Sequence, residues 1–479
     1  MHFLQRHALA RGRPLAWLIL VFVMSLPAVT VRFYAADEIE YFAYLRSMWF
    51  DRDISFDNEY RYFYEHGIAQ GGRARPGGGY YGDRFYATFL GGTTPTGLRI
   101  NFAPVGTAIL WAPFYVATDA GVRIARALGS DVPADGFSRP YIAAVAYASA
   151  VYGFLALLLA GRIAHRLTGA GIGPVLAVWL GTPLLFYMYI APGFSHAASA
   201  FIVAAFVAVW LYVRRDWSLG GLAALGGLAA LMGMVREQDL FIALGPALDY
   251  AVALVRTARV NTAAARAMLA RATAGAATFA ICFLPQLATY QALFGRLGPS
   301  PQIERKMTWT SPNAWLVLAS PENGWLFWTP LMLPALAGLA WLATRKDERH
   351  RIGAICLFMV ATQIYVAGSL DTWAGAGSFG QRRLIGLTVF LVIGLATLWV
   401  SINSRVPKMA LQVFVVLAVW WNVGLIAQFG SGLMNRQHLN MRHNTYHNFV
   451  TVPLSVPNLA YLYITDRQSF YENRSRSTR

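Results

Sequence analysis

Long apolar stretches alternate with short polar connections along most of the chain. The first stretch runs from Leu15 to Val31, and ten more follow at residues 140–160, 172–190, 196–213, 218–235, 240–255, 273–293, 326–344, 352–368, 384–402 and 409–428. Most of them approach the roughly 20 residues that an α-helix needs to cross a bilayer. The pattern predicts an all-α integral membrane protein, a polytopic helical bundle of 11 to 13 transmembrane helices.

Residues 102–120 leave the number of crossings open. They are apolar but contain Pro104 and Pro113. The stretch predicts either a re-entrant or interfacial pair of short helices or one additional crossing.

Composition excludes a soluble protein. Of 479 residues, 56% are hydrophobic and 13% are charged, whereas soluble domains average about 25% charged residues. The formal net charge of +17 comes from basic residues between the apolar stretches, which indicates membrane topology and no nucleic-acid partner. Cys282 and Cys356 both lie in predicted spans, so the sequence predicts neither a disulfide framework nor a cysteine-ligated metal.

Basic residues in the short connections predict the orientation. If the N-terminus is cytoplasmic, the cytoplasmic connections hold 17 Lys and Arg and the opposite ones hold six. We therefore interpret the first stretch as a transmembrane helix and not as a cleaved signal. Residues 1–428 form the expected membrane domain, with a first extracytoplasmic loop at 34–101, and residues 429–479 form a polar tail outside, frayed from Glu472 to Arg479.

The first extracytoplasmic loop concentrates acidic residues. It holds nine of the 23 Asp and Glu, seven of them from Asp37 to Glu59. An apolar stripe at helical spacing predicts an amphipathic helix lying in the membrane interface, and its members are Ile39, Phe42, Leu45, Met48 and Trp49. Asp37 and Glu40 have the spacing of a capping box, so Asp37 has both a structural and a functional interpretation.

Several short motifs occur in an order typical of one enzyme family. The acidic pair begins the run D-E-x-x-Y-F-A-Y-L-R-S after the first predicted helix. The later motifs are Asn101-Phe-Ala-Pro-Val-Gly-Thr107, Trp111-Ala-Pro-Phe114, Ser195-His196-Ala197, Gly227 to Arg236, Ser320-Pro-Glu-Asn-Gly-Trp325 and Gly377-Ser-Phe-Gly-Gln-Arg-Arg383. The chain resembles the GT-C membrane glycosyltransferases, especially the branch of protein O-mannosyltransferases and lipid A aminoarabinose transferases. It departs from them in lacking a clear Lys-Pro-Pro segment before residue 102 and a large C-terminal sugar-binding domain.

The resemblance implies transfer of a sugar from a polyprenyl-phosphate donor to a hydroxyl of a lipid, glycan or protein acceptor, on the extracytoplasmic face. Membrane lipids are further expected partners. The absence of organelle-targeting signals favours a bacterial inner membrane, with the site facing the periplasm or exterior. The expected catalytic residues are Asp37 as the base and Glu38 beside it, the donor phosphate residues are Arg382, Arg383 and Arg236, and the substrate-binding residues are Asp51, Asp53, His196 and Glu322.

Each assignment has a structural alternative. Arg382 and Arg383 are also typical of residues that anchor a helix end at the lipid headgroups. His196 is also typical of a residue that makes a structural polar contact at the end of a span. Arg236 has the alternative of an ion pair with Glu237 or Asp239, and Glu322 that of a turn residue. No cofactor is assigned, and a divalent cation near Asp51, Asp53 and Asp57 stays open.

Two other functional classes remain. A lipid-linked sugar flippase or secondary transporter also needs many helices, but predicts ionisable residues in mid-membrane between broken helices. The predicted spans are nearly free of charged residues, which favours surface chemistry. A non-catalytic envelope assembly protein would have the same helices without a need for Asp37.

Overall fold

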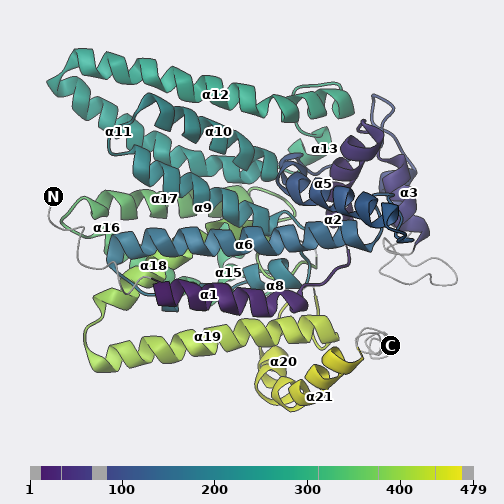
Figure 1. Ribbon diagram of the computed structural model, residues 1–479. Helices are drawn as coiled ribbons and strands as arrows, with labels where there is room; N and C mark the ends of the chain where they lie inside the picture. The colour runs from purple at the N-terminus through teal and green to yellow at the C-terminus, as the bar shows by residue number, and fades with distance from the viewer. Residues whose placement is uncertain are drawn as a thin grey trace. The chain divides into compact units, whose positions relative to one another are not determined.

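The computed structural model describes residues 12–33, 35–66, 84–310, 312–375, 377–436 and 438–466 (Figure 1). Every regular element in these ranges is helical and none is a β-strand. Seven segments are at least 18 residues long and apolar enough to cross a bilayer: Arg139–Thr168, His196–Val213, Glu237–Val260, Thr262–Phe294, Arg349–Gly368, Arg382–Ser401 and Arg405–Ser431. Shorter apolar helices of 10 to 17 residues occupy Leu15–Ala28, Leu219–Val235 and Met332–Ala343. The expected all-α, polytopic membrane architecture is confirmed.

The chain forms two compact units, each assembled from separate stretches of sequence. The first comprises Met1–Ala160 and Tyr187–Met307, and the second Gly161–Phe186 and Thr308–Arg479. Elements of the first unit are α1 (Gly12–Ser25), η1 (Leu26–Ala28), α2 (Ala36–Arg46), η2 (Ser47–Asp51), α3 (Asp57–Glu65), η3 (Tyr86–Leu90), α5 (Gly106–Ala127), α9 (His196–Val213), α10 (Leu219–Val235), η4 (Glu237–Ala243), α11 (Leu244–Val260), α12 (Thr262–Phe294) and α13 (Pro301–Glu304).

The second unit contains the C-terminal elements. They are α7 (Gly173–Leu180), α14 (Ala314–Ala319), α15 (Trp325–Trp328), α16 (Met332–Ala343), α17 (Arg349–Gly368), η5 (Arg382–Leu387), α18 (Thr388–Ser401), α19 (Arg405–Ser431), α20 (Met441–Tyr446), η6 (His447–Thr451) and α21 (Val452–Thr465). Helices α6 (Arg139–Thr168) and α8 (Leu184–Tyr189) have residues in both units. The predicted division at residue 428 stays a prediction, although residues 429–466 belong to this second unit.

The predicted span at 172–190 is a broken helix. Helix α7 ends at Leu180 and α8 begins at Leu184. The buried side chain of Asn422 donates hydrogen bonds to the carbonyl oxygens of Leu180, at 2.8 Å, and Thr182, at 3.0 Å. Non-helical backbone at membrane depth needs such internal partners, because lipid supplies none. An amide from a neighbouring span therefore makes the break tolerable.

Residues 102–120 do not form the predicted re-entrant or interfacial pair of short helices. One helix, α5, runs through Pro113 from Gly106 to Ala127. It is not among the helices apolar enough to count as a span. Proline removes one backbone donor and bends a helix without always ending it. The re-entrant pair is therefore replaced by one continuous helix.

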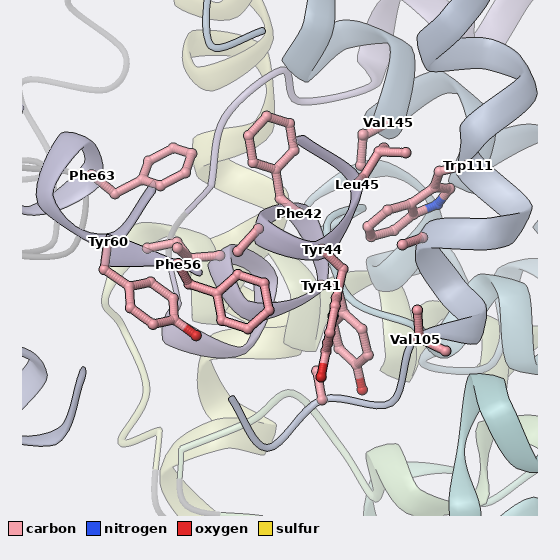
Figure 2. Close-up of a cluster of buried hydrophobic side chains, with 14 of the residues drawn as sticks. Tyr41, Phe42, Tyr44, Leu45, Phe56, Tyr60, Phe63, Val105, Trp111 and Val145 are labelled. Atoms are coloured by element: carbon pink, nitrogen blue, oxygen red, sulfur yellow. The ribbon is translucent and has the colours of Figure 1, made fainter. Parts of the chain in front are cut away.

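Helix α2 is a core element. Ile39 and Phe42 are fully buried, and Leu45 is 3% exposed. Figure 2 shows these aromatic and aliphatic side chains meeting those of α3, α5 and α6, with Trp111 and Val145 beside Leu45. Exposed side chains begin only at Met48 and Trp49, which are 39% and 43% exposed. The apolar stripe from Ile39 to Leu45 therefore packs inside the protein, and the position of α2 relative to the bilayer surface stays a prediction.

Small residues bring α10 and α12 into backbone contact. These helices lie side by side in Figure 1, and both carry glycines at the contact. A Cβ on Gly226 would lie 2.0 Å from the carbonyl oxygen of Gly275. The tandem GGLAAL hexapeptide of α10 therefore serves helix packing, as membrane helices commonly use small residues.

The tail beyond residue 428 contains further helices. Helix α19 continues to Ser431, and α20, η6 and α21 follow. The segment from Glu472 to Arg479, which we expected to fray, lies outside the described residues.

Candidate active site

The acidic pair lies in the first turn of α2, at the end of the connection from α1. The helix begins at Ala36, with Ala35 as its N-cap. One oxygen of Glu38 accepts a hydrogen bond from the Ala35 N–H at 3.1 Å, and the other accepts one from the Gly193 N–H at 3.2 Å. Glu38 is fully buried. Its carboxylate thus holds the start of α2 against the segment that precedes α9.

The capping residue is not the one that the spacing predicted. We expected Asp37 to cap with Glu40, but the helix begins two residues earlier than that spacing predicts, and Glu38 takes the capping role. The carboxylate of Glu40 instead accepts from the Phe102 N–H at 2.7 Å, and the Asn101 side chain donates to the Glu40 carbonyl at 2.9 Å. Glu40 therefore anchors the Asn101-Phe-Ala-Pro motif to α2. Asp37 is half-buried.

Tyr41, one turn after Asp37, connects α2 to the beginning of α9. The Ser195 hydroxyl donates to the Tyr41 oxygen at 2.9 Å, and Nη1 of Arg236 lies 3.4 Å from the same Ser195 oxygen. Burial raises the pKa of Tyr41, the positive charge of Arg236 opposes this shift, and the negative charges of Asp37 and Glu40 add to it. Asp37 and Arg236, which carry opposite charges, thus shift the pKa of the same Tyr41 hydroxyl in opposite directions.

Arg236 is held by neutral acceptors. Its Nη1 lies 2.7 Å from Nδ1 of His196, and its Nη2 donates to Oε1 of Gln238 at 3.3 Å. A guanidinium only donates, so Nδ1 of His196 must accept and the imidazole is neutral, with its proton on Nε2. None of the ion pairs between described residues includes Arg236. The alternative of a simple ion pair with Glu237 or Asp239 is therefore wrong.

The two carboxylates after Arg236 have partners on other helices. Glu237 accepts from the hydroxyl of Tyr290 on α12, and Asp239 accepts from the hydroxyl of Ser199 on α9 at 2.5 Å. Asp239 is 1% exposed. These contacts fix η4 between α9 and α12, so the backbone at Arg236 is positioned by both neighbours.

Asp51 and Asp53 belong to a separate network in the first loop. Arg46 bridges Asp51 and the buried Glu59, at 3.0 Å from the latter, and its guanidinium lies 4.4 Å from the ring centroid of Phe137. The Asp53 carboxylate accepts from the Ser47 hydroxyl at 2.6 Å and from the Ser55 N–H at 3.0 Å. Both aspartates are exposed but hold the turn after α2 in place. Their proposed contact with substrate stays a prediction.

Burial has a strong electrostatic effect on Glu59. Its carboxylate is fully buried, and burial raises its pKa to about 7 although Arg46 opposes the shift. One of its oxygens has no hydrogen-bond partner among the described residues.

No group of three or more His, Cys, Asp or Glu that would hold a metal ion occurs in the described parts of the chain.

The remaining predicted site residues lie in the second unit. Arg382 and Arg383 begin η5, and Nη2 of Arg383 donates to the carbonyl and hydroxyl oxygens of Thr372 at 3.0 and 3.1 Å. Glu322 is exposed in a turn, where its N–H lies 3.2 Å from the Ser320 hydroxyl. The next residue, Asn323, is buried and donates to the carbonyl of Gly380 at 2.8 Å. The two motifs around Glu322 and Arg382 are therefore connected within this unit.

Sequence reasoning missed the residues that connect the motifs of the first unit. Tyr41 and Ser195 complete the contact between α2 and Arg236, and Gly193 supplies a backbone donor to Glu38. A Cβ on Gly193 would lie 2.8 Å from that carboxylate oxygen and from the ring of Phe33. The glycine immediately before Phe194-Ser195-His196 was the available signal for this close approach.

Comparison of the chain with models of known protein families finds no match, and comparison with curated proteins finds none either. The argument for function therefore rests on the residues and their geometry.

Proposed function

We propose that the protein is an integral-membrane glycosyltransferase of GT-C type, which transfers a sugar from a polyprenyl-phosphate donor to a hydroxyl of a lipid, glycan or protein acceptor. The observation that carries this proposal is the pairing of a half-buried carboxylate, Asp37, with a guanidinium held by neutral acceptors, Arg236, around Tyr41. Displacement of a sugar from a phosphate needs a base for the acceptor and a cation for the leaving group.

In the proposed reaction Asp37 takes the proton of the acceptor hydroxyl. The acceptor oxygen bonds to the anomeric carbon while the bond between that carbon and the phosphate oxygen breaks. The electron pair leaves with the polyprenyl phosphate, whose added negative charge Arg236 stabilises. One direct displacement inverts the anomeric configuration.

The contacts divide the roles of the two acidic residues. Glu38 has both oxygens engaged by backbone N–H groups, so it acts as a positioning residue for the first turn of α2. Asp37 follows Ala36 in that turn and is half-buried. His196 accepts from Arg236 and so orients the guanidinium.

The second unit contributes proposed residues of its own. Arg382 and Arg383 are proposed as cations for a donor phosphate and Glu322 as a residue that contacts substrate. Asp51 and Asp53, proposed to contact substrate as well, belong to the first unit. A bacterial inner membrane with the site on the extracytoplasmic face agrees with the distribution of basic connections.

The test is a paired measurement in sealed proteoliposomes. Purified protein is given a panel of polyprenyl-phosphate donors with labelled sugars and hydroxyl acceptors, and both glycoside formation and donor translocation are measured. Glycoside formation without translocation is expected. Translocation without transfer would overturn the proposal in favour of a flippase, and the absence of both would favour a non-catalytic assembly role.

A further inference from the structure

The C-terminal helices carry an unusually long run without charge. From His443 to Thr465 the chain has 23 consecutive residues without Asp, Glu, Lys or Arg. Helix α20, η6 and α21 occupy this run. In this protein every other run of that length coincides with the apolar spans or borders them, so the composition indicates surroundings other than bulk water.

Buried amides attach this run to α19. Gln428 donates to the Asn448 side-chain oxygen at 2.6 Å and accepts from the Asn444 side chain at 2.8 Å. Asn448 in turn donates to the Trp421 carbonyl at 3.2 Å. All three amide residues are at most 1% exposed. A Cβ on Gly424 would lie 2.0 Å from the Asn448 oxygen, so the glycine permits this contact.

The attachment lies within the membrane-spanning part of α19. This helix has 27 residues, which corresponds to about 40 Å, whereas the hydrocarbon core is about 30 Å thick. Trp421 lies ten residues before the last helical residue, Ser431, or about 15 Å along the axis. Asn448 therefore contacts α19 between about one and three helical turns before the end of that helix, where the amide network satisfies its polar groups.

The outward side chains of the same segment are apolar. Tyr446, Phe449 and Leu454 are 59%, 47% and 78% exposed. On α19 itself Val416 and Leu417 are 66% and 49% exposed, and α19 contacts both η6 and α21 (Figure 1). The exposed apolar surface of the C-terminal helices thus continues the lipid-facing surface of a span.

We propose that residues 441–465 form a membrane-embedded interfacial element, whose exposed apolar side chains contact the acyl chains of bilayer lipids beside the C-terminal half of α19. The bilayer is the occupant that fits, because residues 443–465 carry no Asp, Glu, Lys or Arg, their exposed apolar side chains continue the apolar surface of a span, and buried amides attach them to α19 before its end. Pro453 and Pro457 and the buried amides keep the segment from crossing as one straight helix.

The test is lipid quenching of a fluorescent label on Leu454. In a background with Cys282→Ala and Cys356→Ala, Leu454→Cys is labelled with an environment-sensitive fluorophore, and the full-length protein is reconstituted with brominated phospholipids. Val416→Cys is the lipid-facing control and Asp216→Cys, on an exposed connection after α9, is the aqueous control.

Quenching at position 454 by bromines near the headgroup is expected to be as strong as the strongest quenching at 416, and to be weaker for bromines deep in the chain, whereas Val416, in the middle of α19, is quenched most by deep bromines. Quenching as weak as at 216 with full access to aqueous iodide would overturn the proposal. Shielding from both quenchers would assign the surface to a second copy or another protein and would also overturn it.

The variant Asn448→Ala tests the attachment. Removal of this amide takes away one acceptor of the buried Gln428 side chain, which keeps its hydrogen bonds with Asn444, and also removes the hydrogen bond to the Trp421 carbonyl. Lipid quenching at 454 is therefore expected to fall toward the aqueous value. The Val416 label in the same variant reports whether the rest of the helix remains inserted. Unchanged quenching at both positions would contradict the role of the amide network.

Discussion

The contacts of Glu38 predict that its removal destabilises the first unit. The substitution Glu38→Ala leaves two backbone donors, on Ala35 and Gly193, without their charged acceptor. A hydrogen bond to a charged group contributes about 1.5–3 kcal/mol. Both partners are lost together, so the expected destabilisation is about 3–6 kcal/mol.

Thermal unfolding of purified protein in detergent measures this effect. A loss of 1 kcal/mol lowers the Tm of a large domain by roughly 2 °C, so Glu38→Ala is expected to lower it by at least about 6 °C. Glu38→Gln retains one acceptor oxygen and should lie between wild type and Glu38→Ala. The matched control is Glu65→Ala, the same change at an exposed position near the end of α3, which should shift the Tm very little.

An unchanged Tm for Glu38→Ala would refute the anchoring role. The carboxylate would then be available for chemistry, and the division of roles between Asp37 and Glu38 would have to be reversed.

Two other predictions concern packing and pH. Gly226→Ala places a methyl group 2.0 Å from the Gly275 carbonyl oxygen and should lower the Tm strongly. The control Gly220→Ala, in the same tandem repeat, meets nothing within 4 Å and should leave the Tm unchanged or raise it slightly. Equal effects on the Tm would contradict the close packing of α10 on α12. Burial raises the pKa of Glu59 from 4.5 to about 7, so its folded state binds the proton more tightly. Stability is therefore greatest below pH 4.5 for this group and is lost as the pH rises through 7, by up to about 3 kcal/mol. In Tm measurements from pH 5 to 8, Glu59→Gln should remove this part of the decline, and an unaltered pH profile would show that Glu59 is not its source.

Hydrophobic periodicity predicted the fold class because lipid imposes a length and an apolar composition on each span. It did not show what α2 packs against, because the apolar stripe from Ile39 to Leu45 looks the same whether it faces lipid or protein. It also failed at residues 181–183, since nothing in an apolar stretch shows that Asn422, far along the chain, satisfies a break.

The sequence predicted which charged residues form the candidate site, but it did not predict which contacts each of them makes. Asp37 and Glu38 are adjacent and chemically similar, and their difference comes from the backbone N–H of Gly193. Arg236 was open to an ion-pair interpretation because Glu237 follows it directly. The helix geometry instead turns the guanidinium toward His196 and Glu237 toward Tyr290.

The rate of sugar transfer by Asp37→Asn, compared with wild type at matched protein level, tests the central claim most directly. The substitution keeps the size of the side chain and removes the proposed base, while Asp216→Asn makes the same change on an exposed connection of the same unit. A general base contributes about 100-fold or more to such a rate. We predict a loss of at least about 100-fold for Asp37→Asn with the Tm retained, and a wild-type rate for Asp216→Asn. Transfer by Asp37→Asn at the wild-type rate would contradict the account.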